Sequence, residues 1–156
     1  MTEREKHITT KVGLLRSELE KLTTFFEQGL DYSVMVYELW NAKDILGHIT
    51  FWHESFARNI SDLGKGITPT PLKGKLSEVN KLSIDATKTA TIQDLIERLK
   101  VAQKVIEEFI LMESITFIPY KKGSRDYSRE EHLEIVSNHI RKHLHDIKKK
   151  YATTKK

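Results

Sequence analysis

Cysteine is absent from this 156-residue chain, and its absence excludes several kinds of chemistry. Without a thiol of its own, the protein has no disulfide scaffold, no thiolate metal site and no cysteine nucleophile. Long apolar runs are missing as well, since no stretch approaches the roughly 18 residues that a transmembrane helix requires. The first six residues also lack the apolar core of a signal peptide. We therefore expect a cytoplasmic protein that has no membrane association.

The composition is that of amphipathic helices with solvated outer faces, because hydrophobic residues make up 38% of the chain and charged residues 31%. The length suits one domain spanning residues 1–156. The net charge is +4, and lysines crowd the C-terminus at Lys148, Lys149, Lys150, Lys155 and Lys156. Such a run is typical of a solvated helix end. No aromatic residues interleave with these lysines, so we do not expect nucleic-acid binding.

Four long segments have helical periodicity, at about residues 2–28, 41–63, 91–112 and 128–151. Each begins with a polar capping residue that is followed three positions later by an acidic residue. These pairs are Thr2 with Glu5, Asn41 with Asp44, Thr91 with Asp94, and Ser128 with Glu131. The pattern predicts an all-α protein, a four-helix bundle.

The connection between the second and third long segments, from Gly64 to Ala90, is unusually long for a compact domain. It is weakly helical near residues 77–86. A crossover of this length would let the second and third long helices lie parallel to each other.

Three histidines are candidate metal ligands. His139 and His143 are four residues apart, so they lie one above the other on a helix. His48 flanks the apolar stripe of the second long helix. His132 falls on the same flank as His139 and His143, and His145 falls on the far side, where we expect solvent. Three neutral histidines with an open fourth position form a catalytic type of metal site, and neutral imidazole suits zinc, nickel, copper or iron(II).

Hydrogen-bonded histidines at a helix interface are the competing interpretation. The chain has seven histidines, so two will often fall four residues apart by chance. Spacing alone leaves the two interpretations open.

The run from Trp40 to Trp52 includes Lys43, Asp44 and His48, and it resembles the W-x-x-K-D-[IVL]-L-x-H-[IL]-x-x-W motif of the DinB/YfiT-like superfamily. The chain looks closest to the DfsB/ClbS branch. The segment from His139 to Ile147 is similar to that family's last helix, and the chain carries further matching residues at Asn80, Pro119 and Tyr120.

The resemblance implies a four-helix bundle with up-down-down-up topology and a divalent metal on His48, His139 and His143. It also implies a chemistry, because members include transferases that use low-molecular-weight thiols and a resistance protein that opens a cyclopropane by hydrolysis. Homodimers are common in the superfamily, so a homodimer is expected here.

Other residues have two interpretations each. Trp52 could form a wall of a substrate pocket or belong to the core, and Tyr37, Tyr120 and Tyr127 could roof the site or cap a bundle end. Glu54 could be a general base, but its helical position favours a solvated carboxylate. The basic residues before the last helix could attract an acidic thiol or substrate, but we expect a solvated loop; they are Lys121, Lys122, Arg125 and Arg129.

These observations favour a metal-dependent hydrolase or thiol-dependent transferase acting on a small electrophilic molecule, with zinc or nickel as the metal. Any thiol must come from outside the protein. The pocket candidates are Trp52 and Tyr120. The alternative is a non-catalytic bundle that binds or sequesters a small molecule without metal chemistry.

Overall fold

A computed structural model describes residues 1–154, and within them the chain is all-helical with no strand. Its five helices are α1 (Glu3–Phe26), α2 (Ala42–Gly64), α3 (Leu76–Thr87), α4 (Ile92–Phe109) and α5 (Arg129–Thr154). Across this described part, no helix combines the length and apolarity needed to cross a membrane. Two lysines of the predicted basic C-terminus, Lys155 and Lys156, lie outside the described residues.

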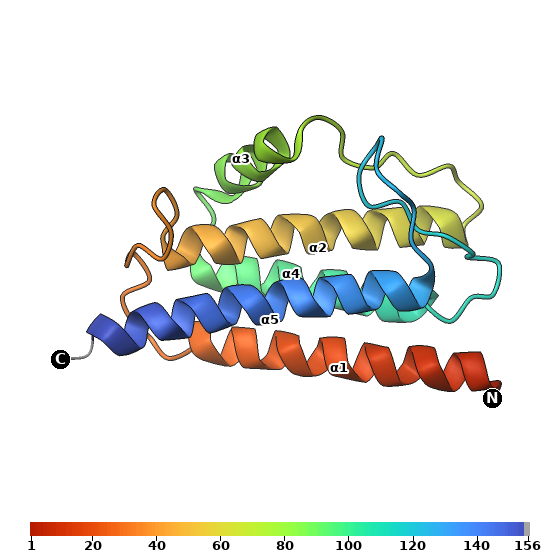
Figure 1. Cartoon of the computed structure of the whole chain (residues 1–156), viewed down its shortest axis with the longest axis horizontal. Coiled ribbons are helices and arrows are strands. Elements are labelled where there is room, and N and C mark those ends of the chain that lie inside the picture. The colour runs from red at the N-terminus through yellow and green to blue at the C-terminus, as the bar shows by residue number, and fades with distance from the viewer. Residues whose placement is uncertain (155–156) are drawn as a thin grey trace.

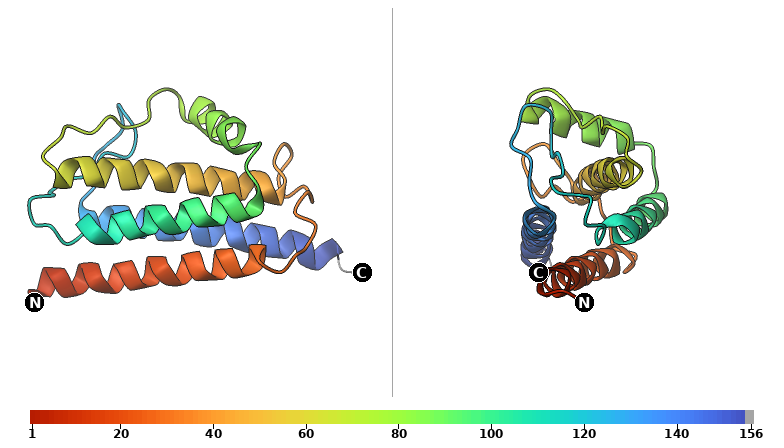
Figure 2. Two further views of the ribbon diagram at one scale, coloured as in Figure 1. Left: turned by 180° about the vertical axis from the view of Figure 1, so that it is seen from behind. Right: turned by 90° about the vertical axis from the view of Figure 1, so that its right-hand side faces the viewer.

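The helices α1, α2, α4 and α5 lie lengthwise against one another, and α3 lies over α2 on the outside (Figure 1). The most extensive contacts join α2 to α4, α1 to α5 and α2 to α3. Figures 1 and 2 show α2 and α4 running in one direction and α1 and α5 in the other. Because α2 also contacts α5, side chains from these two helices can meet inside the bundle.

Local hydrogen bonds explain why the long helices begin where they do. Thr2 accepts a hydrogen bond from the Glu5 backbone N–H at 3.1 Å, which satisfies one free donor of α1. The other three starts are reciprocal capping boxes, in which the cap and the acidic side chain each bond to the other residue's backbone N–H. They are formed by Asn41 with Asp44, Thr91 with Asp94, and Ser128 with Glu131.

The sequence predicted four helices, and the structure has a fifth because the crossover folds into α3. This helix buries Val79, Ser83, Ile84 and Thr87. Its cap position, Lys75, makes no side-chain cap hydrogen bond. Packing on α2 therefore stabilises α3 more than any local start signal does, and for this reason the segment looked only weakly helical in the sequence.

One hydrophobic cluster joins the four long helices. Its fully or almost fully buried members include Leu15 of α1, Ile45 of α2, Leu99 of α4 and Ile140 of α5. Each of the four residues lies in one of the four segments for which the sequence predicts a helix. The cluster fixes which faces of α2 and α5 point inward, and so it positions the histidines on their flanks.

Candidate metal centre

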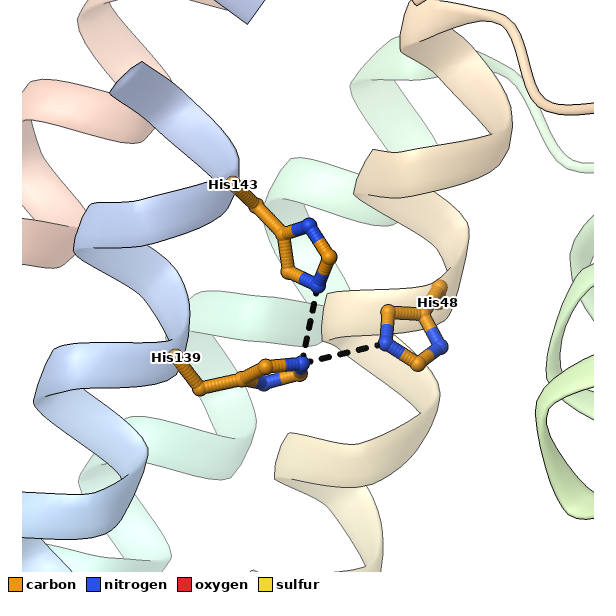
Figure 3. Close-up of side chains that lie close together, drawn as sticks. All are labelled: His48, His139 and His143. Atoms are coloured by element: carbon orange, nitrogen blue, oxygen red, sulfur yellow. Dashed lines mark hydrogen bonds between the residues drawn. The ribbon is translucent and has the colours of Figure 1, made fainter. Parts of the chain in front are cut away.

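The structure brings together the three histidines singled out from the sequence. His48 comes from α2, and His139 and His143 come from successive turns of α5 (Figure 3). The Nε2 atom of His139 lies 3.2 Å from Nε2 of His48 and 2.8 Å from Nε2 of His143. One ligand nitrogen from each residue lies within 4.8 Å of the other two.

A hydroxyl group fixes the tautomer of His48. Its Nδ1 lies 3.0 Å from Oγ of Ser83 on α3, and that hydroxyl donates its single hydrogen to the backbone carbonyl of Asn80 at 2.5 Å. The Ser83 oxygen is therefore left to accept from His48 Nδ1–H. In neutral His48 the lone pair is consequently on Nε2, the atom that faces the other two histidines.

A second hydroxyl does the same for His143. Its Nδ1 lies 2.9 Å from the Tyr37 hydroxyl, which donates to the Asp146 carboxylate at 2.6 Å. Because an ionised carboxylate only accepts, the Tyr37 oxygen accepts from His143 Nδ1–H. The lone pair of neutral His143 is therefore also on Nε2. Outer hydrogen bonds of this kind orient the metal-binding histidines of known metalloproteins.

Two Nε2 lone pairs thus face a single Nε2 atom, that of His139. Neutral His139 has at most one hydrogen on this atom, so it can donate to only one of the two neighbours. Whichever nitrogen of neutral His139 carries the hydrogen, at least one of the two neighbouring lone pairs has no hydrogen to accept unless a cation lies between the rings. A metal ion at the centre of the cluster would remove this conflict.

The spacing of the nitrogens also fits a metal. Zinc–nitrogen bonds of about 2.0–2.1 Å in a tetrahedral arrangement separate two ligand nitrogens by about 3.3 Å. The separations of 3.2 and 2.8 Å are within about 0.5 Å of this value, and the nitrogens of the third pair lie within 4.8 Å of each other. The residues present therefore fit a divalent metal held by three neutral imidazoles.

Burial keeps all three imidazoles in the neutral form that ligates metals. It lowers the pKa of His48 to about 2, with a further contribution from the neighbouring His139 and His143. Burial also lowers the pKa of His139 to about 4, helped by Lys142, and the pKa of His143 to about 4, helped by His139. At neutral pH none of the three requires deprotonation before a metal binds.

A buried pocket adjoins the cluster, with His139 in its lining. Trp52 and Tyr120 stack there with ring centres 4.8 Å apart and an angle of 14° between the planes. The Trp52 indole N–H donates to the Asn80 side chain at 3.1 Å. Trp52 is 8% exposed, so it is both a buried residue and a wall of the pocket.

The tyrosines of the loops divide between two places. Tyr37 contacts the cluster directly, because its hydroxyl lies 2.9 Å from Nδ1 of His143. Tyr127 lies against Tyr120, with ring centres 6.3 Å apart. It therefore packs against a residue of the pocket lining but does not itself line the pocket.

Several expectations need correction. Glu54 forms an ion pair with Arg98 of α4 at 2.6 Å, so it is held against a neighbouring helix. Arg129 is buried, and its guanidinium donates a hydrogen bond at 2.9 Å to the carbonyl of Ile110, the residue that caps the C-terminus of α4. Arg129 is therefore not part of a solvated loop, in contrast to the expectation from the sequence. His132 is buried against Phe56, with ring centres 4.2 Å apart, and is not part of the cluster. His145 is exposed as predicted.

The sequence did not identify two groups that hold the cluster. Asp146 lies three residues after His143, so the helical spacing could have revealed it. Ser83 comes from the crossover and contacts His48 only because α3 packs on α2, and no sequence pattern indicates that packing. His53, a buried residue of the pocket, was also not singled out.

No family model and no curated protein matches the sequence. Two solved structures share the fold. One is the mycothiol-dependent maleylpyruvate isomerase, with a TM-score of 0.73, 13% identity and coverage of 90% of this chain and 60% of that chain. The other is a histidine-to-alanine mutant of that enzyme, with a TM-score of 0.71, 12% identity and the same coverage.

At this identity the likeness shows that the two chains share a helical fold. The chain spans about 60% of the length of these neighbours.

Proposed function

We propose that this protein is a metal-dependent enzyme that binds one divalent metal, zinc or nickel, on His48, His139 and His143. A metal held there would supply a Lewis acid that activates water or a thiol for attack at neutral pH. The substrate is a small electrophilic molecule, and the reaction is a hydrolysis or a thiol transfer.

The convergence of three Nε2 atoms carries this proposal. Two of them have their lone pairs directed inward by hydroxyl groups that accept at Nδ1. Hydrogen bonding among neutral histidines cannot satisfy all three nitrogens at once, whereas a cation can. A three-histidine site also leaves coordination positions for a reactant, as in catalytic zinc sites.

The chain's own residues would do the remaining work. Ser83 and Tyr37 hold two histidines in register, and the stacked Trp52 and Tyr120 offer a flat apolar wall for the substrate beside His139. Because the chain contains no cysteine, a thiol reactant would be an external low-molecular-weight compound. The structural neighbour is described as mycothiol-dependent, which supports a thiol of this class.

The narrower expectations from the sequence belong to the same proposal. We infer an up-down-down-up bundle as one domain over residues 1–156, of the DfsB/ClbS branch, in a cytoplasmic homodimer that acts in detoxification or stress resistance. The directions of the four long helices in Figures 1 and 2 support the topology.

Metal analysis of tag-free protein by mass spectrometry tests the proposal. We expect about one zinc or nickel ion per chain in the wild type and almost none in His48→Ala, because two ligands bind far more weakly than three. His145→Ala is the matched control, since this exposed histidine of α5 lies only two residues from His143. Wild-type protein without stoichiometric metal, or a His48→Ala variant with full metal content, would contradict the proposal.

The alternative, a non-catalytic bundle that binds or sequesters a small molecule, is favoured by the buried aromatic pocket itself. It requires ligand binding that survives both chelation and alanine at all three histidines. The metal proposal requires turnover to be lost both after chelation and after alanine substitution of the three histidines.

A further inference from the structure

Helix α4 has a second apolar stripe that the core of the bundle does not bury. The core stripe of this helix includes Leu95, Leu99 and Ile106, all of them fully buried. Val101 lies on another face of α4 and is 59% exposed, and the half-buried Val105 lies one turn further along that face. The stripe continues to the end of the helix and consists of Val101, Val105, Phe109 and Met112. A contiguous apolar stripe that stays exposed marks a surface for a partner.

The stripe borders an open groove between α2 and α4. Two small residues, Ala57 of α2 and Ala102 of α4, line the groove and are buried, so they form its floor. The groove has a volume of about 340 Å³, and Val101 and Val105 also line it. Side chains that protrude from one helix pack into grooves of this kind on another. The face therefore offers both a ridge and a groove, as a self-complementary surface requires.

Charged residues of both signs frame the groove. Glu54 of α2 and Arg98 of α4 form an ion pair at 2.6 Å, so these two charges compensate each other. Arg58 of α2 and Glu97 of α4 also line the groove, and both are exposed. Within residues 1–154 neither of the two forms an ion pair or a side-chain hydrogen bond. The face therefore presents one uncompensated positive charge and one uncompensated negative charge.

These two charges are offset along the bundle. Helices α2 and α4 run in the same direction (Figures 1 and 2), and the ion pair of Glu54 with Arg98 sets their register. Arg58 comes four residues after Glu54. Glu97 comes one residue before Arg98, so at 1.5 Å per residue Arg58 and Glu97 are separated by about 7 Å along the helices. Val101 lies between these two levels.

A two-fold axis that crosses the face between Arg58 and Glu97 therefore exchanges their positions. It brings each charge to the opposite charge of a second copy, and it places the two Val101 side chains close to each other. An isologous interface has this property, because residue i contacts residue j of the partner and j contacts i.

We propose that the face formed by α2 and α4 is the interface of a symmetric homodimer, in which Arg58 of each copy pairs with Glu97 of the other. The apolar stripe of each copy packs against the groove of its partner. This goes beyond the homodimer of the proposed function, because it assigns the surface. The end-on view in Figure 2 places α4 and α5 on different sides of α2, so the interface leaves the metal centre between α2 and α5 open to reactants.

Charge reversal tests the pairing, with the dimer dissociation constant of the full chain measured by analytical ultracentrifugation. Arg58→Glu brings like charges together at both symmetric contacts, and so does Glu97→Arg. We expect each single variant to weaken the dimer at least about tenfold. The double variant restores opposite charges and should recover most of the wild-type affinity.

Lys104→Glu is the matched control. It makes the same change of charge on α4 but borders the groove between α1 and α4, so the dimer should persist. Arg58, Glu97 and Lys104 are all exposed, and circular dichroism should show the wild-type helical content in every variant. A wild-type protein that is monomeric at every concentration tested, reversals without effect, or a double variant no better than the single ones would overturn the proposal.

Metal content, measured on the same samples by mass spectrometry, separates this proposal from the metal centre. Arg58→Glu should bind as much metal as the wild type. A monomer with stoichiometric metal would end this proposal and leave the metal-enzyme proposal standing. A dimer that depends on Arg58 and Glu97 but binds no metal would do the reverse.

Discussion

At the scale of single residues, two hydroxyl groups with one hydrogen each decide what the histidines can bind. Ser83 gives its hydrogen to a carbonyl, and Tyr37 gives its hydrogen to Asp146, so each oxygen is left as an acceptor for a histidine N–H. These two hydrogen-bond arrangements place the Nε2 lone pairs of His48 and His143 towards His139. The metal preference of the cluster therefore depends on residues that would not touch the metal.

Tyr37→Phe tests this dependence. The change removes the acceptor of His143 Nδ1–H and leaves the Asp146 carboxylate without its tyrosine partner. We expect metal affinity to fall by about 10- to 100-fold, as for other outer-shell changes. Competition with a chromophoric chelator measures it. Tyr32→Phe is the control, because Tyr32 also loses one hydrogen bond, to the Phe25 carbonyl, away from the cluster. Equal metal affinity in Tyr37→Phe and wild type would show that the hydrogen bond between Tyr37 and His143 has no role in metal binding.

The buried histidines should also make folding stability depend on pH. Burial lowers the pKa of His53, His132, His139 and His143 to about 4 in the folded chain, and that of His48 further. In the unfolded chain each titrates near 6.5, so below that pH the unfolded state binds more protons. The stability is fully present above about pH 6.5 and is lost as the pH falls towards 4.

Urea unfolding in the presence of a chelator at pH 7, 6 and 5 measures this loss. Each such histidine contributes at most about 1.4 kcal/mol per pH unit, so we expect a clear fall between pH 6 and 5. Carboxylates do not explain a fall in this range; Asp94, for example, has a pKa lowered by hydrogen bonds with Thr91 and responds only in stronger acid. The same stability at pH 7 and pH 5 would be inconsistent with neutral buried histidines.

At the scale of elements, the close packing of α3 on α2 depends on one glycine. A Cβ added to Gly47 would lie 2.1 Å from Oγ1 of Thr87, closer than two non-bonded heavy atoms can approach. Gly47 precedes His48, and Thr87 lies one turn after Ser83 on α3. The glycine therefore allows the approach that brings the Ser83 hydroxyl to His48.

Gly47→Ala should destabilise the fold by about 1–3 kcal/mol, because α3 must move away from α2. Gly13→Ala is the matched control: this glycine of α1 has nothing within 4 Å of an added Cβ, so alanine should stabilise its helix by about 0.5–1 kcal/mol. Chemical denaturation of both variants measures the difference. A Gly47→Ala variant as stable as Gly13→Ala would mean that the close contact is not needed.

The starts of the long helices could be predicted from sequence because their signals are local. Asn41 with Asp44 and Thr91 with Asp94 form the expected capping boxes. The helix α3 was only weakly indicated, because it has no side-chain cap at Lys75 and its buried face matters only against α2. Because the position of α3 could not be predicted, the contact between Ser83 and His48 could not be predicted either.

At the scale of the whole molecule, the site needs two helices far apart in the chain. The i, i+4 spacing of His139 and His143 is a local signal, but the meeting with His48 depends on how α2 and α5 pack. The prediction that His48 lies beside His139 and His143 came from the resemblance of the segment around His48 to a family motif. Nothing local indicated that His132 would lie in the pocket with His53, since its position on the flank of α5 is similar to that of His139.

X-ray absorption at the zinc edge of zinc-loaded, tag-free protein is the most direct measurement of the metal centre. We expect one zinc ion with three imidazole nitrogens at about 2.0–2.1 Å. His139→Ala should lose this signature and His145→Ala should keep it. A zinc spectrum without multiple imidazole ligands, or one that is unchanged in His139→Ala, would contradict a metal site on His48, His139 and His143.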